Sequence, residues 1–114
     1  MKQEALLYLH LCERWDGAMR NADAMTANEL YTRIQSLTSA ILAEGNAAEL
    51  SNIADVAPDA AALFIAANFL NDNPEKRTLV YEKLALSDLP HIAASAGFIL
   101  RERREKMKRY QEPQ

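Results

Sequence analysis

The chain has 114 residues, 49% of them hydrophobic and 25% charged, and this length favours one domain over two. Its single cysteine excludes an intrachain disulfide, and no apolar run approaches the ~20 residues of a membrane span. The first four residues include an acid and lack the basic, apolar and cleavage features of a signal peptide, so the sequence predicts a soluble cytoplasmic protein. We expect one domain over 1–114, with an ordered core at about 3–104 and a helix end and tail at 105–114.

Two long helices are predicted first, because apolar residues recur at helical spacing. The first, at about 2–20, carries an apolar stripe formed by Tyr8, Leu11, Cys12, Trp15 and Met19. The second begins at a capping box, Thr26 to Glu29, and ends at Gly45, where a left-handed residue is expected. Its stripe consists of Leu30, Ile34, Leu37 and Ile41.

Four shorter helices follow. Asn46 is a candidate cap for the third, whose apolar residues are Leu50, Ile53, Ala54 and Val56. Prolines then open the fourth, fifth and sixth helices, since proline is tolerated in a first helical turn. These helices are expected at about 58–70, 74–87 and 90–106, and Pro113 ends regular structure. The fourth is apolar almost all round, which predicts a central position.

Six helices with short connections predict an all-α fold of antiparallel hairpins. The three helix-opening prolines, at 58, 74 and 90, are separated by 16 residues. Two such steps are about the size of the helix pair in HEAT and armadillo repeats. We therefore expect 46–100 to form a short solenoid of roughly one and a half units, packed against the first two helices.

Three segments carry a likeness to a known group of proteins: 30–34 (LYTRI), 56–61 (VAPDAA) and 93–100 (AASAGFIL). Over about residues 5–104 the chain resembles short bacterial domains with a HEAT/armadillo-like helical fold. Small helical-repeat proteins of this kind are common as immunity proteins of bacterial toxin systems, so the resemblance implies toxin inhibition. The turn at 71–74 and the basic C-terminal end depart from the pattern.

Residues for catalysis or metal binding are sparse. His10 and Cys12 are two apart, which places them on different faces of a helix, and Cys12 belongs to an apolar stripe that predicts burial. His91 lies in a predicted first turn, where a surface or capping role is expected. Two histidines and one cysteine do not make a zinc site, and the glycines form no phosphate-binding loop. The sequence predicts no catalytic residue, metal or cofactor.

The middle of the chain is acidic, because no Lys or Arg occurs between Arg33 and Lys76. Its carboxylates are candidate contacts for a basic partner protein, such as a nuclease-type toxin: Glu44, Glu49, Asp55, Asp59, Asp72 and Glu75. Tyr31 and Tyr81 lie beside the apolar stripes and are expected to be half-exposed, either in this interface or in boundary packing. The alternative for the carboxylates is an ordinary role at helix starts and in loops.

The C-terminal end is basic over Arg101–Arg109, where Glu–Lys and Glu–Arg pairs at i, i+4 are typical of a solvated helix end. An RNA contact or an acidic partner is the alternative, whereas the acidic body is unsuited to nucleic acid. Gly97 and Ala93 form a notch of small side chains, which predicts close approach of another helix.

The leading hypothesis is a non-catalytic protein-binding module, an immunity protein that occludes a toxin. The alternative is a structural or adaptor protein that acts through self-association or peptide binding. The sequence does not decide the oligomeric state.

Overall fold

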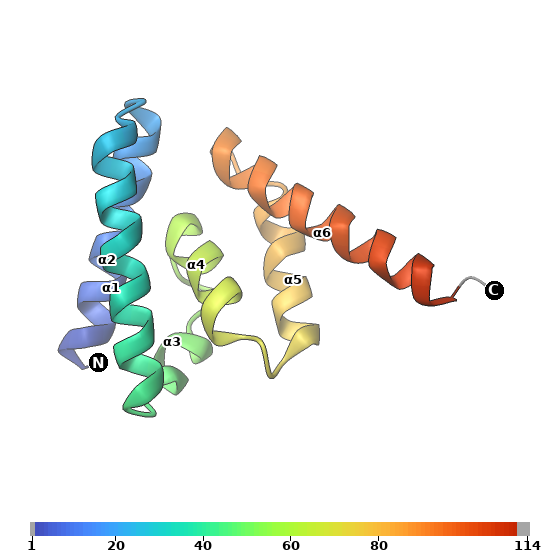
Figure 1. Cartoon of the computed structure of the whole chain (residues 1–114), viewed down its shortest axis with the longest axis horizontal. Coiled ribbons are helices and arrows are strands. Elements are labelled where there is room, and N and C mark those ends of the chain that lie inside the picture. The colour runs from blue at the N-terminus through green and yellow to red at the C-terminus, as the bar shows by residue number, and fades with distance from the viewer. Residues whose placement is uncertain (1, 112–114) are drawn as a thin grey trace.

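The computed structural model describes residues 2–111, with side chains through Lys108, and this part of the chain is all-helical (Figure 1). The prediction of six helices is confirmed for these residues, whereas the predicted end at Pro113 lies outside them. Of these helices, none has both the length and the apolar character that crossing a bilayer requires. The helices are α1 (Gln3–Arg20), α2 (Ala24–Ala43), α3 (Ala47–Asn52), α4 (Asp59–Phe69), α5 (Pro74–Leu84) and α6 (Pro90–Gln111).

The turn from α1 to α2 is tighter than the sequence predicts. The amide of Asp23 donates to the carbonyl of Ala18, and Ala22 between the helices has φ 54°. These are the features of a Schellman motif, with alanine at the left-handed position that glycine usually occupies. Asp23 then caps α2 by accepting from the amide of Thr26 at 3.1 Å. The capping box predicted at Thr26 is therefore wrong, because the preceding turn places Asp23 at the cap.

The end of α2 is predicted correctly, whereas the capping interaction and the end of the next helix are not. Gly45 has φ 73°, and the amide of Asn46 donates to the carbonyl of Ile41, which completes a second Schellman motif. Asn46 makes no capping hydrogen bond, because its side-chain oxygen accepts from the ammonium of Lys2 instead. α3 ends at Asn52, so Val56 lies beyond the helix and is 76% exposed, against the prediction.

Prolines mark the starts of the three later helices, as predicted. Asn73 caps α5 by accepting from the amide of Lys76 at 3.3 Å, and Pro74 fills the first helical position. Pro58 immediately precedes α4, and α6 begins at Pro90. Each proline lacks an amide hydrogen and has a fixed φ, so it is tolerated in the first turn of a helix but disrupts the interior of one.

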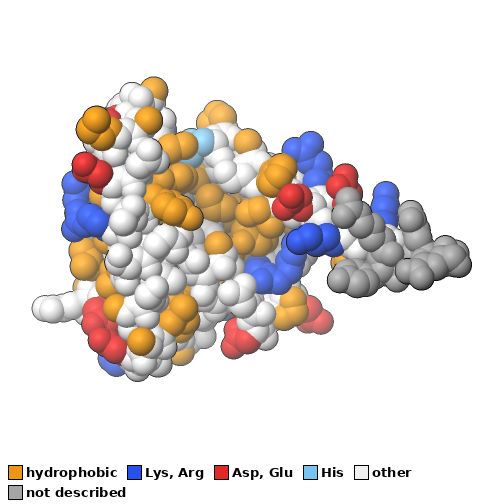
Figure 2. Space-filling model, in the orientation of Figure 1, with side chains coloured by type: hydrophobic (Ala, Val, Ile, Leu, Met, Phe, Trp, Pro, Cys, Tyr) orange, Lys and Arg blue, Asp and Glu red, His pale blue; other side chains and the backbone are white. Residues whose placement is uncertain are grey.

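α6 runs past the end of α5 and projects from the rest of the molecule (Figure 1). Figure 2 shows Lys and Arg side chains on the projecting part. The radius of gyration of 14.8 Å accordingly exceeds the ~13 Å of a compact chain of this size. No atom of another element lies within 4 Å of the point where a Cβ of Gly97 would stand. The predicted close approach at Gly97 is therefore wrong, since α6 packs through Ile92 and Ala96 instead.

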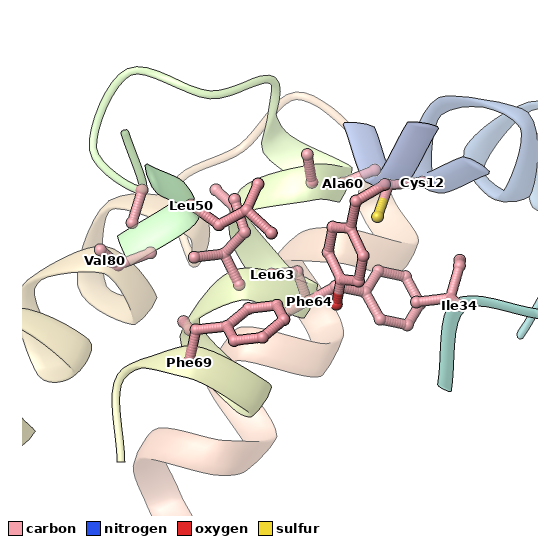
Figure 3. Packing of buried hydrophobic residues seen from close by; sticks show 14 of the residues in the cluster. Cys12, Ile34, Leu50, Ala60, Leu63, Phe64, Phe69 and Val80 are labelled. Atoms are coloured by element: carbon pink, nitrogen blue, oxygen red, sulfur yellow. The ribbon is translucent and has the colours of Figure 1, made fainter. Parts of the chain in front are cut away.

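The core lies where α4 contacts α1, α3, α5 and α6, and α4 is buried almost all round, as predicted. Figure 3 shows buried side chains that meet there, among them Cys12 of α1, Ile34 of α2, Leu50 of α3, Phe69 of α4 and Val80 of α5. Tyr8 is fully buried, and its hydroxyl accepts from Thr38 of α2 and Asn68 of α4, both at 3.1 Å. Burial raises the pKa of Tyr8 to about 12, so this hydroxyl stays neutral in the folded protein.

Candidate protein-binding surfaces

The predicted acidic surface is divided among three places. Glu44 and Glu49 lie near the start of α1, where Glu4 joins them. A hydrogen bond to the Glu44 carboxyl group, followed by burial and charge repulsion, raises the pKa of Glu4 above its ordinary value. The Oε2 atom of Glu49 accepts from the backbone amide of Lys2 at 3.0 Å. Three carboxyl groups thus gather at one end of the molecule beside Lys2.

The next two acids lie against α5 and the turn after it. The ammonium of Lys83 donates to the backbone carbonyl of Asp55 at 2.7 Å, and the hydroxyl of Ser87 donates to the carboxylate of Asp59. A stretch that is purely acidic in sequence is therefore accompanied in space by a cation from α5. This reduces the negative potential that a basic partner meets.

The last two acids are near the start of α5 but face different surroundings. Asp72 lines a hollow of about 480 Å³ between α2, α3 and the α4–α5 turn, together with Lys76. The ammonium of Lys76 donates to the carbonyl of Ser51 across this hollow at 2.8 Å. Glu75 lies on the other side of α5. Figure 2 accordingly shows the acidic side chains of one face as separate groups.

The two candidate tyrosines have different environments. Tyr31 is 49% exposed, as expected, and its ring lies 6.0 Å from that of Phe64. Tyr81 is only 3% exposed, so the prediction of a half-exposed side chain is wrong. α5 contacts both α4 and α6, and its buried arc is therefore wider than a single apolar stripe. Burial also raises the pKa of Tyr81.

An acid–base pair that sequence reasoning missed joins α1 to the start of α6. Nε2 of His91 lies 2.7 Å from the buried carboxylate of Asp16, whose other oxygen lies 3.1 Å from Arg20. The indole of Trp15 lies 5.8 Å from the imidazole. The prediction that His91 has only a surface or capping role is therefore wrong. With both oxygens engaged, the Asp16 carboxylate ties the two helices together and holds the imidazole in place.

A larger open feature is the groove between α5 and α6, with a volume of about 690 Å³. Leu79 and Met107 line it and are 65% and 62% exposed, and Leu100 contributes a half-buried side chain. The hydroxyl of Thr78 in the groove already donates to the Pro74 carbonyl. The groove thus offers mainly apolar contact, and exposed apolar surface of this kind is typical of interaction sites.

The charges along this groove are separated by sign. α5 contributes two acidic residues to the groove, Glu75 and Glu82, which we call the acidic wall. α6 contributes three basic residues, Arg103, Arg104 and Lys106, which we call the basic wall. The cations of α5 point elsewhere: Lys76 and Lys83 to backbone carbonyls, and Arg77 to the side chain of Asn71. Among the side chains described through Lys108, no charge of either wall forms an ion pair.

The basic run of α6 therefore has two parts. Its cations at 103, 104 and 106 line the groove, whereas Arg101 and Lys108 are exposed outside it. The side chain of Arg109 lies outside the described residues. The guanidinium of Arg103 donates to the Thr78 hydroxyl at 3.2 Å, which connects the two helices.

Metal ligation has no support in the described part of the chain, where three or more candidate ligands nowhere gather. Cys12 is buried as predicted, and burial raises the pKa of its thiol, which keeps it protonated. Comparisons of the chain with protein-family models, with curated proteins and with solved structures found no match. The function is therefore inferred from the geometry of the surfaces described above.

Proposed function

We propose that this protein is a non-catalytic protein-binding module and that the α5–α6 groove holds a helical segment of its partner. The observation that carries this proposal is the exposure of Leu79 and Met107 along a groove of about 690 Å³. α5 has 11 residues and is about 16 Å long, so the groove accommodates about three turns of a helix. A helix in such a groove inserts apolar residues at i, i+3 or i+4, and i+7.

The two charged walls define the chemistry of that segment. A helix with basic residues along one edge meets the acidic wall, and acidic residues along its other edge meet the basic wall. Complementary charge of this kind fixes the orientation of a partner and raises its association rate. An amphipathic helix with opposite charges on its two edges therefore fits the groove.

The helical-repeat resemblance is consistent with this use. α3 packs against α4, α4 against α5, and α5 against α6, so each helix of this part contacts its neighbours along the chain. We propose that these helices form a short HEAT/armadillo-like stack. Proteins built in this way use extended surfaces of successive helices for binding.

Replacement of Leu79 by aspartate tests the proposed function. Leu79→Asp places a carboxylate in the apolar groove, and the control Met25→Asp alters another exposed apolar residue that lies outside it. In cells that express the chain naturally, we expect the wild type to form crosslinks with its partner proteins. These crosslinks should disappear with Leu79→Asp and persist with Met25→Asp. Loss with both variants, or with neither, would contradict binding in the groove.

A second candidate function is inhibition of a toxin with a basic surface, and the acidic group of Glu4, Glu44 and Glu49 favours it. A hydrogen bond to the Glu44 carboxyl group, followed by burial and repulsion from its charge, raises the pKa of Glu4 at this end. Co-expression with a toxic protein encoded beside the gene tests this function through cell growth. Reversal by Glu44→Lys and Glu49→Lys is expected to remove protection, whereas Glu82→Lys in the groove leaves it intact. Protection that survives the reversal would contradict this candidate.

A further inference from the structure

The partner in the α5–α6 groove can be specified further from the two charged walls. We infer that the groove binds a second copy of this chain, related to the first by a twofold axis. This assignment depends on the proposed function, because it uses the same groove. It adds the identity of the partner and the arrangement of the two copies.

A twofold axis brings one surface patch against itself in reverse orientation, so residue i contacts j and j contacts i. A groove with charges of one sign would repel itself in this arrangement. Here the acidic wall of one copy faces the basic wall of the other, and the same contact occurs a second time across the axis. The separation of charge between α5 and α6 therefore makes the groove complementary to itself.

The apolar residues of the groove suit the centre of such an interface. Leu79, Leu100 and Met107 line the groove together with the charged residues, and contact with the second copy removes them from water. Stable interfaces combine apolar contact with polar contact, and the residues that line the groove supply both.

The shape of α6 points the same way. α6 has 22 residues, about 33 Å, whereas α5 has 11, about 16 Å. In Figure 1 the C-terminal turns of α6 extend beyond α5. A second copy supplies the helices that cover these turns.

Charge reversal of each wall tests the arrangement. One variant combines Glu75→Lys with Glu82→Lys, and the other combines Arg104→Glu with Lys106→Glu; Arg103 is left unchanged because it donates to Thr78. A matched control combines Arg101→Glu with Lys108→Glu, which reverses two exposed cations of α6 outside the groove. The mass of each protein is measured by sedimentation equilibrium over a range of concentrations, alone and in an equal mixture of the two wall variants.

We expect the wild type and the control to dimerise, and each wall variant alone to dimerise at least about tenfold more weakly. The equal mixture is expected to recover the dimer. The acidic wall of one variant, reversed to basic, then faces the basic wall of the other, reversed to acidic, and the two unreversed walls face each other, so both contacts between opposite charges are restored. A wild type that stays monomeric at every concentration would overturn the inference. So would wall variants that dimerise normally, or a mixture that recovers nothing.

Failure of this inference can be told apart from failure of the proposed function. If the wild type is monomeric while Leu79→Asp still abolishes crosslinking to a different protein, then the groove binds a foreign helix and only the second copy is wrong. If the wild type is monomeric and Leu79→Asp changes no crosslink, both are wrong.

Discussion

The N-terminal body, formed by α1, α2 and α4, differs from the α5–α6 pair because aromatic rings close its interior, whereas the pair leaves an open groove between its helices. In the body, the ring of Trp15 packs edge-on against Phe64 at 4.9 Å, and Tyr8 packs against Phe69 at 5.3 Å. In the α5–α6 pair, Leu79 remains 65% exposed although its neighbour Val80 is buried. The apolar α4 thus fills the core of the body, whereas the more polar α5 leaves Leu79 on the groove. This groove is the binding surface that we propose.

Matched leucine replacements provide the largest expected effect. Leu11→Ala removes a side chain that is 2% exposed in the body and should lower the free energy of unfolding by about 2–5 kcal/mol. Leu79→Ala in the groove should change it by less than about 0.5 kcal/mol in the single chain. Urea unfolding at a concentration where sedimentation shows one copy measures both. Similar losses at the two positions would contradict the distinction between the regions.

Removal of the buried hydroxyl sharpens the description of the body. Tyr8→Phe keeps the aromatic packing but leaves Asn68 without the acceptor that joins α1 to α4. We expect a loss of about 1–3 kcal/mol, since a buried donor without a partner is costly. Tyr31→Phe is the control, because Tyr31 is half-exposed and its hydroxyl has no comparable burial. An equal effect of the two changes in urea unfolding would contradict the role of the buried hydroxyl.

The two Schellman motifs allow opposite changes at equivalent positions. Ala22 and Gly45 both have positive φ, and only glycine adopts this conformation without strain. Ala22→Gly is therefore expected to raise the thermal midpoint and to stabilise the fold by about 1 kcal/mol. Gly45→Ala should lower the stability by a similar amount, with open space around its Cβ. Shifts of the same sign in both variants would contradict the assignment of strain.

The smallest expected effect concerns Glu4 and pH. Its folded-state pKa is raised above the ordinary value of 4.5, so the folded protein holds this proton more tightly than the unfolded chain. The resulting stability is present below 4.5 and is lost as the pH rises through the folded-state value. Glu4→Gln should remove this part of the pH dependence, whereas Glu13→Gln, at an exposed position of α1, should retain it. The free energy of unfolding is measured at pH values below 4.5 and above the folded-state pKa of Glu4. An equal pH dependence in the two variants would contradict the pairing of Glu4 with Glu44.

Local signals in the sequence predicted the helices well, and contacts between distant residues explain what it missed. Asn73 and Pro74 specify a helix start by themselves, and Gly45 specifies an end. The Asp16–His91 pair joins residues that are 75 positions apart, so no spacing rule reveals it. The groove likewise depends on how α5 and α6 pack. The order of charges along the sequence also does not show that Lys83 lies beside Asp55, because only the fold brings them together.

The central claim is that the groove is open in one chain and covered by a second protein chain. Cysteine labelling tests it directly, because the natural Cys12 is buried and a cysteine introduced by Leu79→Cys is the one in the groove. Met25→Cys serves as the exposed control outside the groove. We predict that both introduced cysteines are labelled rapidly in dilute solution. In concentrated solution or inside cells, only the cysteine at position 79 is expected to become slow to label. Equal labelling of the two variants under every condition would contradict the account.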